Sequence, residues 1–66
     1  MKRIEKRIET VNNEFVTVER VKVRDNEKIP TRKLNKLEKR GLVKDWFVRL
    51  NSDRVRVLTI IWSGLI

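Results

Sequence analysis

The chain contains no cysteine and no histidine among its 66 residues. Without cysteine it can form neither disulfides nor thiolate metal sites, and without histidine it lacks the commonest general base and the imidazole ligand. Its nine acidic residues are spread among lysines and arginines, and no two of them form the spaced pair typical of a general acid and base. We therefore expect a protein that is not an enzyme and that binds no metal and no cofactor.

Long apolar runs are also scarce. The longest, residues 57–66, is about half of the ~20 residues that a membrane-spanning helix needs. The basic residues 1–7 do not continue into the apolar stretch of a signal peptide. The sequence thus predicts a soluble, cytoplasmic protein without a membrane partner.

Positive charge is abundant instead. Seventeen lysines and arginines against nine acidic residues give a net charge of +8 and a pI near 10.7. Such a surface favours polyanions, of which nucleic acid is the first choice. At this length we expect a single small basic domain, residues 1–66, that buries only about 60% of its unfolded surface. Because the core is thin, association with a second copy would stabilise it, and we expect a homo-oligomer.

The segment 29–43 is expected to contain a short basic helix, residues 31–40. The chain enters this helix through Ile29-Pro30 and leaves it through Gly41. Thr31 is expected to cap its start, and Gly41 suits the left-handed position just past its end. Leu34 and Leu37 share one side of this helix. Arg32, Lys36 and Lys39, with Asn35 beside them, point nearly the opposite way.

The helix carries half of the net charge, because its five cations less Glu38 give +4. The alternative interpretation is a solvated basic face on an ordinary small domain. Under the leading hypothesis these cations contact nucleic-acid phosphates, and an asparagine beside them could read base edges. These residues are Arg32, Lys33, Lys36, Lys39 and Arg40, with Asn35.

Residues 1–13 allow two interpretations, helix or strand. Apolar residues at positions 4, 8, 11 and 15 repeat at helical spacing, whereas residues 15–23 are dense in β-branched side chains and follow a plausible turn at Asn12-Asn13. We favour a β-hairpin over the helix because folding about this turn creates favourable cross-strand pairs. The expected pairs are Lys6 with Glu19, Glu5 with Arg20, and Ile4 with Val21.

A second hairpin is expected after Gly41, with its turn at residues 51–53. Pairing Leu50 with Val55 places Arg49 opposite Arg56, with Arg54 beside them. Like charges directly opposite are unfavourable, which favours an anion-binding role for Arg49, Arg54 and Arg56. The alternative is that these three arginines simply extend into water. The same register pairs Val48 with Val57, Trp46 with Thr59 and Phe47 with Leu58.

The last strand carries large apolar groups on both faces, so it should be central in the sheet or lie against another subunit. The uncharged tail, residues 63–66, should be covered. Trp62, Leu65 and Ile66 are the expected contacts with a second copy or a protein partner. Trp46, Phe47 and Trp62 are expected in the core together with Phe15, rather than on the surface as platforms for RNA bases.

The expected fold class is α+β: two β-hairpins with one short basic helix between them, in the order ββαββ. Ile29-Pro30 opens the helix and Gly41-Leu42 closes it. In these motifs, and in the segments 21–24 and 45–58, the chain resembles the swapped-hairpin DNA-binding domains of the AbrB and MazE kind. The resemblance covers roughly residues 15–60. The resemblance implies an intertwined homodimer that binds DNA, as a transition-state regulator or an antitoxin does.

A second resemblance competes with the first. Residues 34–43, followed by a hairpin with Asp53-Arg54 at its turn, are similar to the recognition helix and wing of winged-helix regulators, which would place the helix in the major groove. Both resemblances imply a DNA-binding regulator. Independently of them, RNA is an alternative ligand if Trp46, Phe47 or Trp62 is exposed and stacks bases. The alternative function is a small inhibitor or adaptor that docks on a protein through its apolar C-terminal strand.

Overall fold

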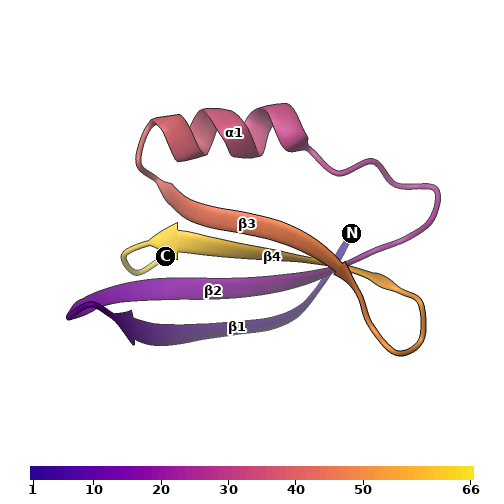
Figure 1. The fold of residues 1–66 in the computed structure, drawn as a ribbon, viewed down its shortest axis with the longest axis horizontal. Coiled ribbons are helices and arrows are strands. Elements are labelled where there is room, and N and C mark those ends of the chain that lie inside the picture. The colour runs from indigo at the N-terminus through magenta and orange to yellow at the C-terminus, as the bar shows by residue number, and fades with distance from the viewer.

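The computed structural model describes all 66 residues as a four-stranded antiparallel sheet with one helix (Figure 1). The elements in chain order are β1 (Lys2–Val11), β2 (Glu14–Val23), α1 (Thr31–Lys39), β3 (Val43–Leu50) and β4 (Arg56–Ser63). The strands lie side by side in the order β1-β2-β4-β3. The predicted α+β class and the ββαββ order are confirmed. The winged helix is wrong, because residues that would have to form its first helices form β1 and β2.

The β1–β2 hairpin turns at Asn12 and Asn13, which both have positive φ (52° and 65°). Positive φ at both central residues suits the right-handed twist of a two-residue hairpin, and asparagine tolerates it. The predicted pairs Lys6–Glu19 and Glu5–Arg20 are confirmed. The pair of Ile4 with Val21 is wrong: Arg3 lies opposite Val21, because a bulge between Arg3 and Glu5 leaves Ile4 unpaired.

The β3–β4 hairpin has a register one residue away from the prediction. Leu50 lies opposite Arg56 rather than Val55. The cause is the turn, in which Arg54 adopts a positive φ of 60° and its amide donates to the carbonyl of Asn51. This left-handed residue after the tight turn lengthens the connection by one residue.

The slip changes every predicted pair in this hairpin. Val48, Trp46 and Phe47 lie opposite Leu58, Ile60 and Thr59 respectively. Arg49 lies opposite Val57 and not Arg56, so the predicted arginine pair does not exist.

Helix α1 packs over β3 on one face of the sheet, where it forms the outermost layer (Figure 1). Leu34, on its inner side, is only 3% exposed. It belongs to a core cluster of Val23, Leu34, Val43, Leu58 and Ile60, against which Leu37, Trp46, Val48 and Trp62 pack. Trp46 and Trp62 are partly buried against this core, as predicted, whereas Phe47 lies on the other face of the sheet and its predicted core position is wrong.

The two ends of α1 differ in how their backbone groups are satisfied. Thr31 is the first helical residue and makes no capping hydrogen bond, so the expected Thr31 cap is wrong. At the other end Gly41 has φ +77°, as predicted, and donates to the carbonyl of Glu38. The amide of Leu42 reaches back to Leu37, which completes a Schellman motif.

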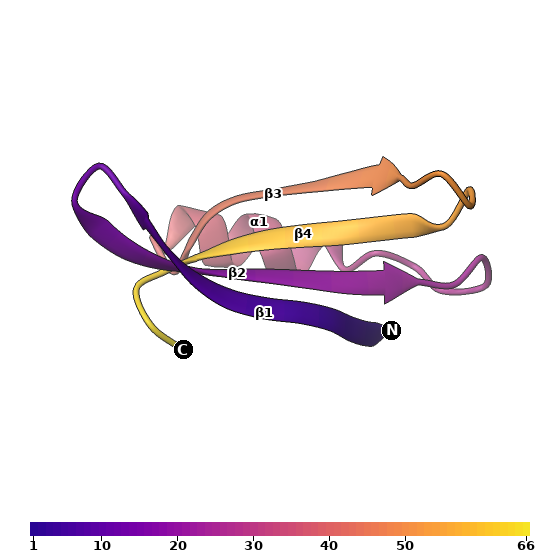
Figure 2. The same cartoon turned by 90° about the horizontal axis from the view of Figure 1, so that it is seen from below.

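Strand β4 is central, as its apolar faces predicted, and the tail after it bends back across β2 (Figure 2). The hydroxyl of Thr17 donates to the carbonyl of Gly64 and accepts from the amide of Ile66. The side chains of Leu65 and Ile66 are nevertheless 62% and 57% exposed. The expectation of a covered tail is therefore wrong.

Phe15, at the start of β2, is 61% exposed, so the prediction that it fills the interior is also wrong.

Candidate nucleic-acid interface

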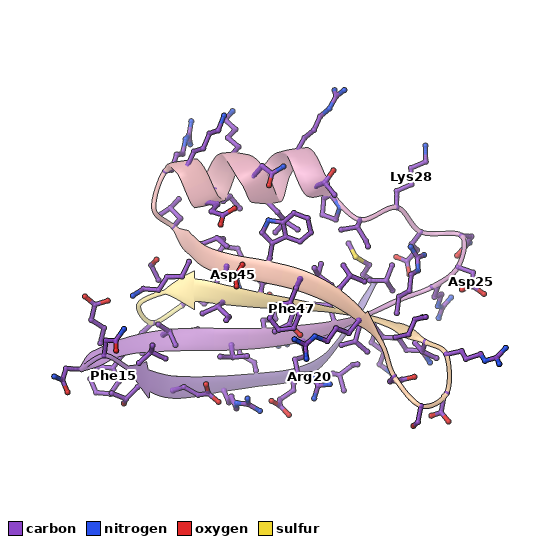
Figure 3. All side chains as sticks on the ribbon, viewed as in Figure 1. Phe15, Arg20, Asp25, Lys28, Asp45 and Phe47 are labelled. Atoms are coloured by element: carbon purple, nitrogen blue, oxygen red, sulfur yellow. The ribbon has the colours of Figure 1, made fainter.

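The outward side of α1 is the most concentrated positive surface of the chain. Its six predicted site residues are all exposed: Arg32, Lys33, Asn35, Lys36, Lys39 and Arg40. Figure 3 shows long side chains projecting from this helix away from the sheet. Arg32, Lys36 and Lys39 lie on the side of the helix opposite the buried Leu34, whereas Lys33 and Asn35 lie on its two flanks.

None of the five cations on α1 forms an ion pair. The salt bridges of the chain join other groups: the N-terminal amine, Arg3, Arg7 and Lys44 with Glu27, Glu19, Glu5, Glu9 and Glu14. Lys36 and Lys39, in the last turn of the helix, do interact favourably with its negative end. Their charges still face solvent without an acidic partner, so they are free to contact an anion.

The three arginines of the second hairpin do not form a cluster. Arg54 is exposed in the turn. Arg56 donates from its guanidinium to the carbonyls of Arg24 and Glu27, and thereby holds the loop between β2 and α1. Arg49 alone lies on the open sheet face. Of the three, Arg56 has a visible structural role, and the expected joint anion site is not formed.

The sheet face away from α1 carries a second group of candidate side chains, whose grouping the sequence did not reveal. Figure 2 shows α1 on the far side of the sheet, with no helix covering this face. A hollow of about 230 Å³ opens here. It is lined by Arg7, Val18, Arg20, Phe47, Arg49, Val57 and Thr59. The alternation of Phe47 and Arg49 on one strand was the available signal, but the predicted register gave them the wrong neighbours.

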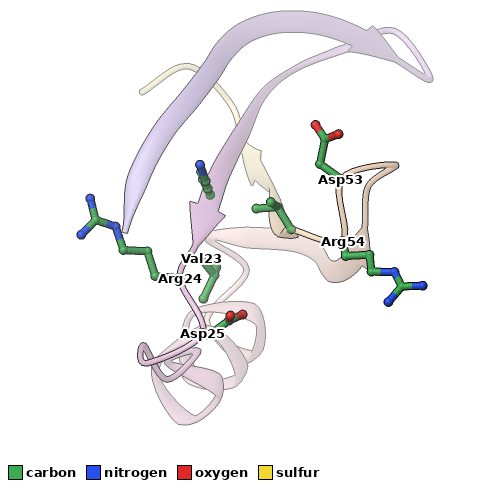
Figure 4. A pocket seen from close by; sticks show the side chains of 7 residues that line it. Val23, Arg24, Asp25, Asp53 and Arg54 are labelled. Carbon is green, nitrogen blue, oxygen red and sulfur yellow. The ribbon is translucent and has the colours of Figure 1, made fainter.

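A larger hollow, of about 430 Å³, lies between the end of β2 and the turn at residues 51–55 (Figure 4). Two acids, Asp25 and Asp53, line it together with Lys22, Arg24 and Arg54. In Figure 4 the Arg24 and Arg54 side chains extend outward, away from the pocket. Its mixed charge does not favour an anion.

The predicted partner contacts divide between core and surface. Trp62 is half-buried against the core, and its indole Nε1 lies 3.3 Å from the Glu19 carboxylate to which it donates. Leu65 and Ile66 lie instead at the exposed end of the sheet. Phe15 and Leu42 share this end, since their carbonyls accept from the amides of Gly64 and Ser63. We call Phe15, Leu42, Leu65 and Ile66 the apolar end.

No helix of the structure is long and apolar enough to cross a membrane. No three acidic side chains of the structure lie close enough together to hold a metal ion.

Comparison with known families, with curated proteins and with solved structures finds no match to this chain. The resemblance to swapped-hairpin domains therefore rests on the short motifs alone.

Proposed function

We propose that this protein binds nucleic acid, most favourably duplex DNA, through the outward side of α1. The observation that supports this function is the arrangement on α1 itself: five exposed cations on nine helical residues and their C-cap, with no acidic partner. A surface that only needed solubility would gain as much from mixed charges, and unpaired like charges repel one another. An anionic ligand removes that repulsion.

The dimensions of α1 suit a nucleic-acid groove. Nine residues at about 1.5 Å each give a helix about 14 Å long, and a B-DNA major groove about 12 Å wide admits a helix. Lys36, Lys39 and Arg40 would contact phosphates, which position the protein without reading sequence. Asn35 lies among them and has the donor and acceptor that match adenine. The role of such a protein would be that of a DNA-binding regulator.

We further propose that the active form is a homodimer joined through the apolar end. The chain exposes 5253 Å², whereas a compact monomer of 8.0 kDa exposes about 4450 Å². The excess is about 800 Å² of surface that a compact monomer of this mass would not expose. Because Phe15, Leu65 and Ile66 are each more than half exposed, a second copy would remove this apolar surface from water.

Binding to labelled random duplexes, followed by fluorescence anisotropy, tests the DNA proposal. The variant Lys36→Glu/Lys39→Glu should lose at least 100-fold in affinity at low salt, because it changes the local charge by four. The matched control Lys2→Glu/Lys22→Glu makes the same charge change on the opposite sheet face. Equal losses in the two variants, or no binding by the wild type, would overturn the role of α1.

Sedimentation equilibrium tests the dimer. The wild type should show twice the chain mass of 8.0 kDa at micromolar concentration, and Leu65→Asp/Ile66→Asp should return it to monomer. A monomeric wild type across the accessible concentrations would contradict this part of the proposal.

The alternative function, a small inhibitor or adaptor, is favoured by the same apolar end. Strand β4 has no free edge, because it lies between β2 and β3. A protein partner would therefore have to contact Leu65 and Ile66 rather than extend the sheet along β4. In that case Leu65→Asp/Ile66→Asp would abolish partner binding, and the charge reversal on α1 would leave it intact.

A further inference from the structure

The sheet face opposite α1 presents an aromatic ring, Phe47, together with two arginines, Arg20 and Arg49, that form no ion pair. Phe47 and Arg49 are alternate residues of β3, so they share a face, and the guanidinium carbon of Arg49 lies 4.7 Å from the centroid of the Phe47 ring. Their strand neighbours Trp46 and Val48 pack toward α1. Phe47 and Arg49 consequently face the open side.

The residues beneath Phe47 and Arg49 are largely apolar and are buried. Val18, Val57 and Thr59 are 5%, 4% and 9% exposed, and they form the bottom of the 230 Å³ hollow. Phe47 itself is only half-buried, although it is among the most apolar side chains of this face. A planar apolar group placed in the hollow would lie beside the Phe47 ring and the Arg49 guanidinium above that ring.

Of the three arginines that line the hollow, only Arg7 forms ion pairs. Arg7 binds both Glu5 and Glu9, and its hydrogen bond to Glu9 raises the pKa of Arg7. These two carboxylates are the acids of β1 on this face. Arg20 lies opposite Glu5 in the sheet but forms no ion pair with it. Arg20 on β2 and Arg49 on β3 thus form no ion pair; Arg49 lies over the Phe47 ring, and Arg20 lies across β4 from it, since both Arg20 and Phe47 pair with Thr59. The acid of β3 on this face is Asp45, two residues before Phe47.

We propose that this face binds single-stranded nucleic acid, with an unpaired base stacked on Phe47 and the flanking phosphates bound by Arg20 and Arg49. Bases have planar π faces that stack on aromatic side chains and on guanidinium groups. The hollow is smaller than the roughly 300 Å³ at which pockets for whole drug-sized ligands begin, which fits one base better than a complete larger ligand. The inference rests on the proposed nucleic-acid function and adds to it a second surface for unpaired strands.

A duplex could not use this face in the same way, because its bases are stacked on one another and their planes are covered. The two surfaces should therefore discriminate by strandedness: α1 contributes to duplex binding, and the Phe47 face contributes only to single strands.

The test compares fluorescein-labelled 20-mers of thymidylate and of uridylate with a random duplex, by anisotropy at low salt. Phe47→Leu keeps the apolar volume and removes the ring, so single-strand affinity should fall about 5- to 100-fold. Duplex affinity should stay within twofold. Phe47→Tyr should restore single-strand binding, and the tighter of the two homopolymers identifies DNA or RNA as the preferred strand.

A matched pair of arginine variants separates position from charge. Arg49→Gln and Arg54→Gln remove the same charge from the same hairpin, but only Arg49 borders the hollow. Arg49→Gln should weaken single-strand binding several-fold more than Arg54→Gln. Equal effects would show that only net charge matters, which would overturn the proposed base site.

Ultraviolet crosslinking to the thymidylate 20-mer gives a readout that does not depend on variants. Cleavage with trypsin after Lys44 and Arg49 releases residues 45–49 as one peptide, and mass spectrometry should find the crosslinked nucleotide on it. Crosslinks found only outside this peptide would overturn the inference even if Phe47→Leu did not fold.

The two proposals fail separately. Duplex binding that depends on Lys36 and Lys39, together with single-strand binding insensitive to Phe47→Leu, would remove only the base site. Single-strand binding that depends on Phe47, together with duplex binding insensitive to the α1 charges, would remove only the role of α1. Absence of binding to every nucleic acid would remove both.

Discussion

The guanidinium of Arg49 lies over the ring of Phe47, with 4.7 Å between the guanidinium carbon and the ring centroid. This contact exists because the two residues alternate on β3 and because Val57, rather than another arginine, lies opposite Arg49.

A double-mutant cycle with Arg49→Met and Phe47→Leu should detect this contact. Methionine keeps the apolar stem of Arg49 and removes the charge. Because Arg49 is exposed, we expect a coupling free energy at the low end of cation–π interactions, about 0.5–1 kcal/mol. Urea denaturation of the four proteins measures it. Strictly additive effects would show that the cation and the ring do not interact in solution.

Leu34→Ala should be among the most destabilising substitutions in the chain. Leu34 is the one fully buried side chain of α1, so its truncation leaves a cavity between the helix and the sheet. Such cavities cost about 2–5 kcal/mol, and a chain of 66 residues has only about 3–10 kcal/mol of stability in total. Asn35→Ala, on the outer side of the same helix, should change the free energy of unfolding by less than about 0.5 kcal/mol. Comparable losses in the two variants would contradict the observed packing of α1.

Gly41→Ala should destabilise through the backbone alone. Gly41 has φ +77° in the Schellman motif, and no atom lies within 4 Å of the place where a Cβ would sit. The expected cost is therefore the left-handed penalty of about 1–2 kcal/mol, without a steric contribution. Gly41→Asn should cost less, because asparagine tolerates this conformation. Thermal unfolding should give a higher melting temperature for Gly41→Asn than for Gly41→Ala. Equal losses of stability in the two variants would indicate a steric clash of the new side chains instead of a backbone penalty.

The parts of the fold that the sequence predicted are those fixed by local chemistry. Asn12-Asn13 accepts the positive φ values of a two-residue turn, so the pairs on either side of it followed directly. The Gly41 end of α1 and the buried position of Leu34 followed in the same way from residue type and helical spacing. The bulge near Ile4 did not, because no residue there marks the place where a strand gains an extra residue.

The second hairpin shows why register is harder to predict than the existence of strands. Arg54 adopts a left-handed conformation that non-glycine residues seldom take, and an arginine in the sequence does not predict it. The one-residue slip that results replaced Leu58 by Thr59 opposite Phe47. The basic surface of α1 was predictable because it depends on spacing within one helix, whereas the Phe47 face depends on the pairing of two strands.

The exposed positions of Phe15, Leu65 and Ile66 were not predictable from hydrophobicity. Apolar residues are usually buried, and the sequence contains no signal for which of them the small core leaves outside. If a second copy covers the apolar end, the expectation of burial fails only for the isolated chain.

Acid should weaken the fold through two carboxylates whose pKa values lie below their usual range. The hydrogen bond from Lys44 lowers the pKa of Glu14, and the hydrogen bond from the N-terminal amine lowers that of Glu27. A carboxylate with a lowered folded-state pKa contributes stability that is fully present above its unfolded pKa and is lost as the pH falls through the folded value. Urea midpoints should therefore be level from pH 7 to about pH 5 and should decline below about pH 4.

Lys44→Met provides the control for this pH dependence. It removes the partner of Glu14, so the decline of its urea midpoint between pH 5 and pH 3 should be shallower than that of the wild type. The change is small, because the Lys44 and Glu14 side chains are 37% and 65% exposed to water, so that salt screens their interaction. An unchanged pH profile would show that the pair does not form in solution.

The salt dependence of duplex binding should count the phosphates that α1 contacts. Each phosphate neutralised by a cation contributes about −0.9 to the slope of log K against log salt concentration. If Lys36 and Lys39 each contact one phosphate, Lys36→Gln/Lys39→Gln should reduce the magnitude of the slope by about 1.8. Lys2→Gln/Lys22→Gln removes the same charge from the opposite face and should leave the slope nearly unchanged, although it lowers overall affinity slightly. Anisotropy titrations between 50 and 200 mM salt, roughly the range over which such slopes are large, measure both. Equal slopes for the two variants would mean that the duplex responds to the +8 net charge as a whole and not to the helix.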